Sequence, residues 1–160
     1  MTDFEGLLKI LQSHGVEFII VGGAAATAHG STHLTVDLDI VYSRSPENIE
    51  RLVSALRPLS PYLRGAPPGL PFRWDAETIL RGLNFTLSTS LGSLDLFGEI
   101  TGGGTYQTLL ANSINITLFG IKCYCLGLDQ LIQVKRAAGR PKDLEVIAEL
   151  ETLREEPDSF

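Results

Sequence analysis

Two aspartates separated by one residue, Asp37 and Asp39, lie in the otherwise apolar and β-branched run 35–42. This run predicts a buried strand, and side chains two residues apart on a strand point to the same face. Both carboxylates therefore project together, while Leu38 and Ile40 face the core. Two like charges in apolar surroundings repel each other and lose solvation unless a cation or a proton compensates. Because hard oxygen ligands suit Mg²⁺ or Mn²⁺, the pair predicts a divalent-metal site.

A third acidic residue, Asp95, has the same setting in the run 93–97, with apolar neighbours on both sides. If its strand lies beside that of Asp37 and Asp39, three carboxylates converge. They would form the ligand set of a two-metal phosphoryl-transfer centre, with ions roughly 3.5–4 Å apart. In such a site the third carboxylate can also orient or deprotonate an attacking hydroxyl.

Two glycines, Gly22 and Gly23, end the run 16–21, in which Glu17 is the only charged residue, and precede an alanine-rich stretch at 24–28. The alanines predict a short helix that Gly30 closes. Glycines let a triphosphate approach the backbone, and the first N–H groups of a helix have no partner of their own. The three glycines at 102–104 predict a flexible turn and not a phosphate loop, because no Gly-Lys-Ser/Thr follows them.

The elements that must position these groups follow from apolar spacing and from capping residues. Helices are expected at 4–14, 24–28, 45–56, 75–80, 105–110, 128–138 and 141–153. Strands are expected at 16–21, 35–42, 84–89, 93–97, 113–119 and 121–126, and the last two pairs of strands each predict a hairpin. Five prolines predict an irregular excursion between the third helix and the fourth, ordered by packing or serving as a flap: Pro58, Pro61, Pro67, Pro68 and Pro71.

The order of these motifs resembles the nucleotidyltransferase superfamily of the DNA polymerase β type. That superfamily has a hydrophobic strand, Gly-Gly or Gly-Ser, a short helix, a D-x-D strand and a third acidic residue on a later strand. The matching residues here are Val21-Gly22-Gly23, Asp37-Leu38-Asp39 and Leu94-Asp95-Leu96. The segment 131–144 looks like the closing segment of small bacterial members, the minimal transferases and the relatives of the AbiEii toxins. The resemblance spans roughly residues 18–150.

The resemblance implies an α/β (α+β) fold, with a mixed sheet flanked by helices and further helices at the C-terminus, in a single domain over 1–160. It implies that Asp37, Asp39 and Asp95 hold Mg²⁺ or Mn²⁺. It also implies that a nucleotidyl group moves from a nucleoside triphosphate to an acceptor hydroxyl with release of pyrophosphate.

Positions near the nucleotide also follow from the resemblance. Gly22 and Gly23 would hold the triphosphate. Ala24 and His33 stand where the superfamily often has a phosphate-contacting Ser or Thr and an arginine. Related toxins use a lysine and an acidic residue from the C-terminal region near the nucleotide. The implied nucleotide-binding positions are therefore Gly22, Gly23, Ala24, His33, Lys135 and Asp143.

Other functions fit part of the pattern. A non-catalytic nucleotide- or partner-binding member of the same fold, such as one half of a toxin–antitoxin pair, fits the small size and the residues at positions 24 and 33. A sugar-nucleotide glycosyltransferase also uses D-x-D, but it normally needs a larger fold. The C-terminal charges also fit a salt-bridged corner between two helices, built from Lys135, Arg140, Lys142 and Asp143.

Composition narrows the choice further. The chain has 160 residues, a hydrophobic fraction of 44% and a formal charge of −6, which disfavours a broad nucleic-acid-binding surface. No apolar run approaches the ~20 residues that cross a bilayer, and no signal-peptide pattern opens the chain, so we expect a cytoplasmic protein with no membrane partner. Cys123 and Cys125 are expected to be reduced residues of a strand. His29 and His33 have no third zinc ligand near them in the sequence, which disfavours a zinc site.

The acceptor does not follow from the sequence. A tRNA end, a protein hydroxyl and a small molecule all fit. A chain this small leaves one side of a nucleotide cleft open, so a homodimer or a cognate partner protein could cover it.

Overall fold

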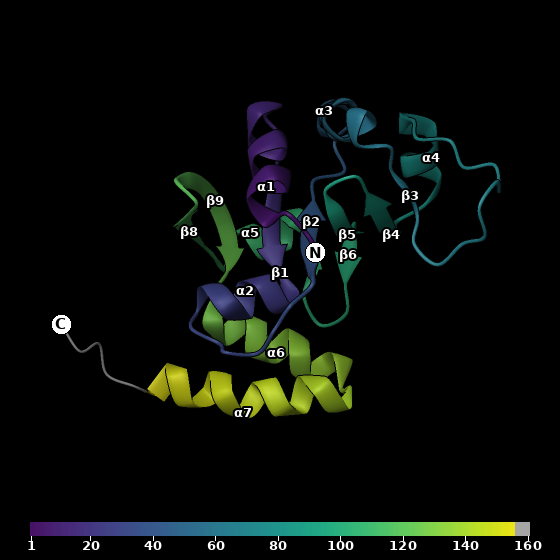
Figure 1. Cartoon of the computed structure of the whole chain (residues 1–160). Coiled ribbons are helices and arrows are strands. Elements are labelled where there is room, and N and C mark those ends of the chain that lie inside the picture. Colours follow the sequence, from purple (N-terminus) through teal and green to yellow (C-terminus); the bar gives the residue numbers. More distant parts are fainter. Residues whose placement is uncertain (156–160) are drawn as a thin grey trace.

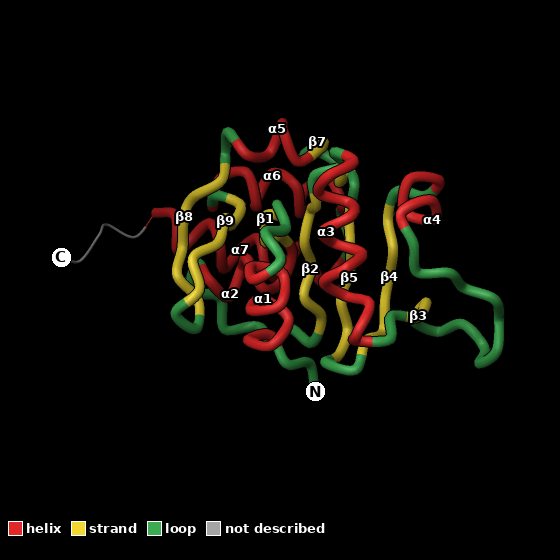
Figure 2. The backbone as a smooth tube through the Cα atoms, turned by 90° about the horizontal axis from the view of Figure 1, so that it is seen from above, coloured by secondary structure: helices red, strands yellow, loops and turns green. Residues whose placement is uncertain are grey.

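The computed structural model describes residues 1–155; the last part of the predicted domain, 156–160, lies outside the described residues. Its centre is a seven-stranded mixed sheet with the strand order β3-β4-β5-β2-β1-β9-β8 (Figure 2). The strands are β1 (Phe18–Val21), β2 (Asp37–Tyr42), β3 (Tyr62–Leu63), β4 (Asn84–Thr89), β5 (Gly92–Phe97), β8 (Ser113–Leu118) and β9 (Ile121–Leu126). β2 runs parallel to β5 and antiparallel to β1, and β1 runs parallel to β9.

Helices lie on both sides of this sheet. They are α1 (Phe4–Ser13), α2 (Gly22–Ala28), α3 (Pro46–Leu56), α4 (Ala76–Arg81), α5 (Tyr106–Leu110), α6 (Leu128–Ala138) and α7 (Pro141–Glu155). α6 and α7 stack beneath α2, on the opposite side of the molecule from α1 and α3 (Figure 1). The mixed sheet, its flanking helices and the C-terminal helices are confirmed. No helix among residues 1–155 combines the length and the apolar character that crossing a membrane requires.

The core explains why these segments adopt their structures. All four residues of β1 are buried, as its continuous apolar sequence predicts. α3 begins at Pro46, and the side chain of Ser45 accepts a hydrogen bond from the backbone N–H of Asn48. Its apolar residues Ile49 and Leu52 are fully buried. Burying each such side chain stabilises the fold by about 1.5–3 kcal/mol.

Three local predictions need correction. The proline-rich excursion is not irregular throughout, because it contains a 3₁₀ turn, η1 (Arg57–Leu59), and the edge strand β3, which pairs with β4. The glycine turn at 102–104 joins two short strands that were not predicted, β6 (Glu99–Ile100) and β7 (Gly104–Thr105). α2 begins at Gly22 and not after Gly23, since the first residues of a helix need no partner for their N–H groups.

Candidate active site

The three aspartates predicted to act together lie on the neighbouring strands β2 and β5. Asp39 is directly opposite Asp95, and Asp37 is opposite Ser93, in the parallel register of the two strands. Leu38, between the two aspartates of β2, and Leu94, directly before Asp95 on β5, are fully buried. Since side chains alternate along a strand, the three carboxylates emerge on the face opposite these leucines.

The glycines ahead of α2 make room for this cluster. Gly22 has φ +64°, and a Cβ at this position would overlap the carboxylate of Asp39. A Cβ on Gly23 would lie 2.6 Å from the hydroxyl oxygen of Thr35. Gly22 therefore combines a backbone conformation that side chains rarely adopt with a position that no side chain can fill.

Asp39 is the least compensated of the three carboxylates. Its Oδ1 is buried and has no hydrogen-bond partner in the described chain. Burial first, then the charge of Asp95 and then that of Asp37 together raise the pKa of Asp39 from 3.8 to about 7. A buried, unpaired carboxylate oxygen beside two like charges is stabilised by a cation. The donor set therefore fits Mg²⁺ or Mn²⁺.

As the side chains stand, no group of three or more His, Cys, Asp or Glu residues within 1–155 is arranged to hold a metal ion. A basic side chain contacts two of the three carboxylates instead. Arg64, directly after β3, donates from Nη2 to Oδ1 of Asp95 at 2.6 Å, and its Nη1 lies 3.5 Å from Oδ1 of Asp37. The sequence analysis missed Arg64, because only the predicted flap pointed to its segment and no spacing links it to the aspartates.

A charged cleft of about 260 Å³ opens beside the carboxylates. It is lined by all three aspartates and by residues from α2, the loop before β2, α6 and α7. Its charged and glycine residues are Gly22, Gly23, His33, Asp37, Asp39, Asp95, Lys135, Arg140, Lys142, Asp143 and Glu145. Of the implied nucleotide-binding positions, only Ala24 does not line this cleft; it packs against the hydrophobic core.

The C-terminal charges form the salt-bridged corner between α6 and α7 that the sequence allowed. The carboxylate of Asp143, 1% exposed, accepts from Nε of Arg140 at 2.7 Å and lies 3.8 Å from Nζ of Lys135. Burial lowers the pKa of Lys135, while the charge of Asp143 acts in the opposite direction. The same corner lines the charged cleft, so a structural role and a ligand-binding role are compatible here.

His33 is held from outside the cleft. Its Nδ1 lies 3.0 Å from Oε1 of Glu149 on α7. The same carboxylate accepts from the hydroxyl of Ser31 and from both the backbone N–H and the hydroxyl of Thr32. These hydrogen bonds, that of Ser31 first, lower the pKa of Glu149 to about 2. Glu149 therefore fixes the loop that precedes β2.

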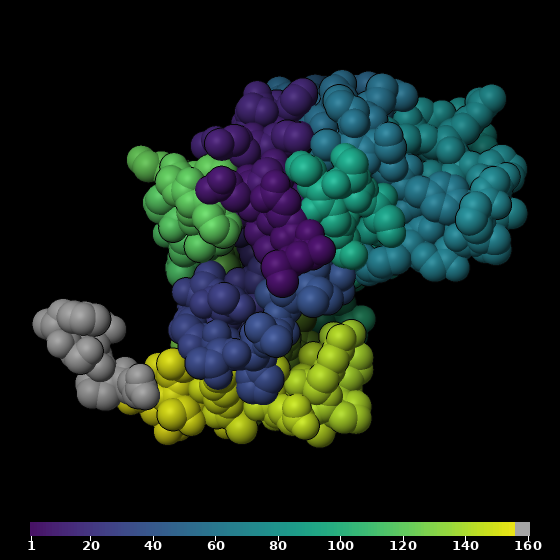
Figure 3. Space-filling model, viewed as in Figure 1, coloured from purple at the N-terminus to yellow at the C-terminus, as the bar shows by residue number. Residues whose placement is uncertain are grey.

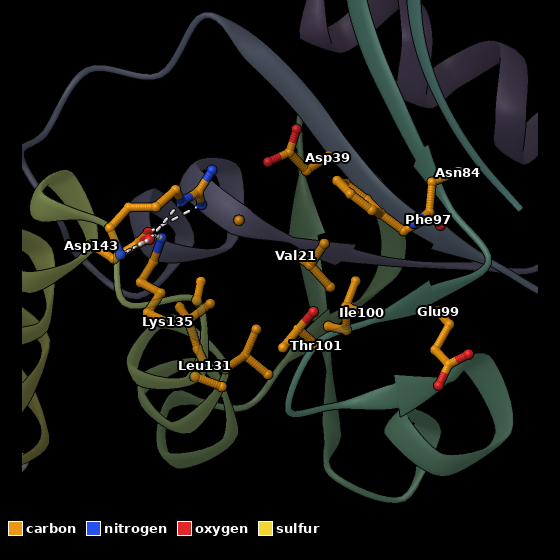
Figure 4. A pocket seen from close by; sticks show the side chains of 15 residues that line it. Val21, Asp39, Asn84, Phe97, Glu99, Ile100, Thr101, Leu131, Lys135 and Asp143 are labelled. Atoms are coloured by element: carbon orange, nitrogen blue, oxygen red, sulfur yellow. Dashed lines mark hydrogen bonds and ion pairs between the residues drawn. The ribbon is translucent and has the colours of Figure 1, made fainter.

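A second cavity, of about 410 Å³, also reaches Asp39 (Figure 4). Phe97 and Ile100 line one wall, and Leu131 and Lys135 on α6 line the facing wall. This cavity and the charged cleft share six lining residues: Gly22, Asp39, Phe97, Lys135, Arg140 and Asp143. The two spaces therefore adjoin along Asp39 and along the corner between α6 and α7.

The remaining candidate ligands have structural contacts. His29 ends α2, and its Nε2 lies 2.8 Å from the carbonyl oxygen of Leu126. Cys123 and Cys125 are buried and free, and burial raises the pKa of the Cys125 thiol to about 12. Neither group offers a zinc site among the described residues.

Comparison with known proteins gives matches at the level of structure. No family model and no curated protein sequence matches the chain. A protein from Thermotoga maritima assigned as a nucleotidyltransferase superposes with a TM-score of 0.58 and 14% identity, over 92% of this chain and 89% of that one. The lincosamide antibiotic adenylyltransferase LnuA, solved with lincomycin, gives a TM-score of 0.62 and 14% identity over 95% and 98%. The antibiotic-resistance factor ANT(2'')-Ia, solved with adenylyl-2''-tobramycin, gives 0.54 and 13% over 94% and 91%.

The chain has the nucleotidyltransferase fold. The resemblance seen in the sequence is thereby confirmed at the level of the fold. Sequence identities of 13–14% assign the fold but not the role of any single residue. The metal-binding and nucleotide-binding roles of the residues named above stay predictions.

Proposed function

We propose that this chain is a metal-dependent nucleotidyltransferase that moves a nucleoside monophosphate from a nucleoside triphosphate to an acceptor hydroxyl and releases pyrophosphate. One observation carries the proposal. Asp39 lies opposite Asp95 on parallel strands, and one oxygen of Asp39 is buried without a partner. A buried carboxylate oxygen beside other carboxylates favours a bound cation that compensates their charge.

Asp37, Asp39 and Asp95 are the residues that would hold Mg²⁺ or Mn²⁺. When bound, the ions would stabilise the negative charge that develops on the transferred phosphoryl group. Asp95 is also the candidate base, because it lies beside Asp39 and at the edge of the charged cleft. It would accept the proton of the acceptor hydroxyl.

The charged cleft is the proposed triphosphate site. Lys135, Arg140 and Lys142 contribute three cationic side chains to it, and Gly22 and Gly23 leave its floor free of side chains. In the proposed reaction the acceptor oxygen forms a bond to the α-phosphorus. The bond between the α-phosphorus and the bridging oxygen of the pyrophosphate breaks, and the cationic side chains receive the departing charge.

The second cavity is the proposed acceptor site, and among tRNA ends, proteins and small molecules we favour a small molecule. The cavity of about 410 Å³ lies within the usual range of small-ligand sites and is bounded by apolar side chains such as Phe97 and Leu131. LnuA and ANT(2'')-Ia were solved with small antibiotics or their adenylylated product. ATP is therefore the first donor to test.

A second function has an observation in its favour. The guanidinium of Arg64 compensates Asp95 and Asp37 without any metal. This internal ion pair, together with Ala24 and His33, favours a non-catalytic nucleotide- or partner-binding module, as in a toxin–antitoxin pair. A homodimer, a cognate partner protein and a cytoplasmic location stay predictions of either function.

Label transfer separates the two functions. The protein is incubated with each α-³²P-labelled nucleoside triphosphate, Mg²⁺ and pools of small hydroxyl compounds, tRNA or protein, and pyrophosphate release is measured in parallel. We expect labelled product and pyrophosphate from the wild type, and a loss of at least about 100-fold in Asp39→Asn and Asp95→Asn. Asp129→Asn, at an exposed position on α6, is the control and keeps full activity. Nucleotide binding without transfer to any acceptor would support the binding module.

A further inference from the structure

The contacts of Arg64 define a relationship between the carboxylate cluster and the proline-rich segment. The backbone N–H of Arg64 donates to the carbonyl oxygen of Thr86 at 2.9 Å, which continues the pairing of β3 with β4. From this edge the side chain crosses β4, donates to the carbonyl oxygen of Leu87 at 3.2 Å, and reaches Asp95 on β5. The guanidinium is therefore aimed at the carboxylates by the backbone and by two further hydrogen bonds.

The guanidinium of Arg64 contacts the same carboxylates that a divalent cation would bind. It contacts Oδ1 of Asp95 at 2.6 Å and lies 3.5 Å from Oδ1 of Asp37, so it bridges two of the three carboxylates. These oxygens cannot accept the guanidinium and coordinate metal ions with the same lone pairs. A positive charge a few ångströms from the ligands also repels an incoming cation.

The segment that follows Arg64 leaves its side chain room to move away from the carboxylates. Gly65 and Gly69 have positive φ angles and no atom within 4 Å of where a Cβ would stand. The loop from β3 to α4 extends away from the sheet in Figure 1 and lies on the surface in Figure 3. Its far end is fixed, because Nε1 of Trp74 donates to the buried carbonyl oxygen of Val53 at 2.9 Å. The middle of the segment has few contacts, namely a hydrogen bond from the hydroxyl of Tyr62 to the carbonyl oxygen of Pro67 and one from the backbone N–H of Ala66 to the carbonyl oxygen of Leu63.

We propose that Arg64 is an internal counter-ion that competes with the divalent cation for Asp37 and Asp95, so that metal binding releases the side chain of Arg64 from both carboxylates. The inference rests on the metal site of the proposed function but not on nucleotidyl transfer. Arg64 acts here as a positioning residue: it keeps the carboxylates together before the metal arrives.

Binding of Mn²⁺ alone, measured by isothermal titration calorimetry without nucleotide, tests the competition. Arg64→Gln removes the charge, and we expect its Mn²⁺ dissociation constant to fall roughly tenfold or more below that of the wild type. Arg64→Lys keeps the charge and should change the constant less. Arg81→Gln is the matched control, because Arg81 is an exposed arginine that pairs with Glu77 on α4, and it should bind Mn²⁺ as the wild type does. Unchanged or weaker binding by Arg64→Gln overturns the proposal, and so does the absence of Mn²⁺ binding in all variants.

A second measurement uses the wild-type protein and so covers the case in which Arg64→Gln does not fold. Trypsin must take the arginine side chain into its own pocket, so the ion pair with Asp95 protects the Arg64–Gly65 bond. We expect Mn²⁺ to speed cleavage at this bond several-fold, while cleavage after the exposed Arg73 stays constant. Equal cleavage after Arg64 with and without Mn²⁺ contradicts the release. A chain that passes both tests but transfers no nucleotide would refute the proposed function and keep this inference.

Discussion

Asp39 and Asp95 face each other across two parallel strands, although they are far apart in the sequence. The two strands are paired by backbone hydrogen bonds and bury Leu38 and Leu94 on one face, so their acidic residues meet on the other face. The guanidinium of Arg64 compensates Asp37 and Asp95, but Oδ1 of Asp39 stays buried beside them without a hydrogen-bond partner in the described chain. The buried charge of Asp39 should therefore lower the free energy of unfolding of the metal-free protein.

Asp39→Asn should stabilise the metal-free protein at pH 8. Because burial and the charge of Asp95 raise the pKa of Asp39 from 3.8 to about 7, the folded state binds a proton there that the unfolded state has lost. The contribution of this group to the free energy of unfolding therefore decreases as the pH rises from about 4 to about 7. Asparagine removes the decrease, and we expect a gain on the order of 2 kcal/mol at pH 8. Urea unfolding in EDTA at pH 5 and pH 8 measures it.

The control for this experiment is Asp129→Asn, which replaces an exposed carboxylate on α6. Its stability should follow that of the wild type at both pH values. If Asp39→Asn lost stability at pH 8, or gained equally at pH 5 and pH 8, Asp39 would not be a strained, buried carboxylate.

Gly22→Ala should destabilise the fold much more than Gly120→Ala. Both glycines have positive φ, +64° and +75°, so each substitution costs about 1–2 kcal/mol of backbone strain. A Cβ at position 22 also overlaps the carboxylate of Asp39, whereas position 120 has no atom within 4 Å. Overpacking of this kind costs about 1–3 kcal/mol more. Chemical denaturation gives both values, and equal losses would mean that the Asp39 side chain can move aside.

Glu149→Gln should loosen the loop that carries His33. The carboxylate holds Ser31, Thr32 and His33 together, and the amide of glutamine cannot accept from all of these donors. We expect hydrogen exchange of the Thr32 amide to become faster, with little change in the strands. Glu151→Gln, on the same helix, is the control, since Glu151 pairs only with Arg136.

The same glutamate has a pH signature of defined sign. Hydrogen bonds from Ser31 and Thr32 lower its pKa from 4.5 to about 2, so its contribution to stability is fully present above pH 4.5. That contribution disappears as the pH falls through about 2. Protection of the Thr32 amide in the wild type, taken relative to its intrinsic exchange rate at each pH, should therefore remain high at pH 5 and decrease towards pH 2. If the Thr32 amide were equally protected in Glu149→Gln and in the wild type at both pH values, Glu149 would not hold this loop.

Local patterns in the sequence were enough to predict most elements. The spacing of Asp37 and Asp39 among apolar residues gave a strand with both carboxylates on one face, and Ser45-Pro46 marked the start of α3. The parallel pairing of β2 with β5 could be stated only as a condition, because strand order depends on contacts between distant segments. Two-residue strands such as Glu99–Ile100 have no periodicity to detect.

The partners of the site residues were harder to predict than the residues themselves. Arg64 and Glu149 are ordinary surface charges in the sequence, and only the folded chain brings them to Asp95 and His33. The roles given to Lys135 and Asp143 depended on the family resemblance. The structure adds that these two residues meet at the corner of α6 and α7 and that both line the charged cleft.

The most direct measurement is an anomalous difference map from crystals grown with Mn²⁺ and a non-hydrolysable ATP analogue. The account predicts manganese peaks about 2.1 Å from carboxylate oxygens of Asp37 and Asp39, with Asp95 bound to one ion and Arg64 withdrawn from Asp95. A map without manganese at these three carboxylates, with the guanidinium of Arg64 still between Asp37 and Asp95, would contradict it.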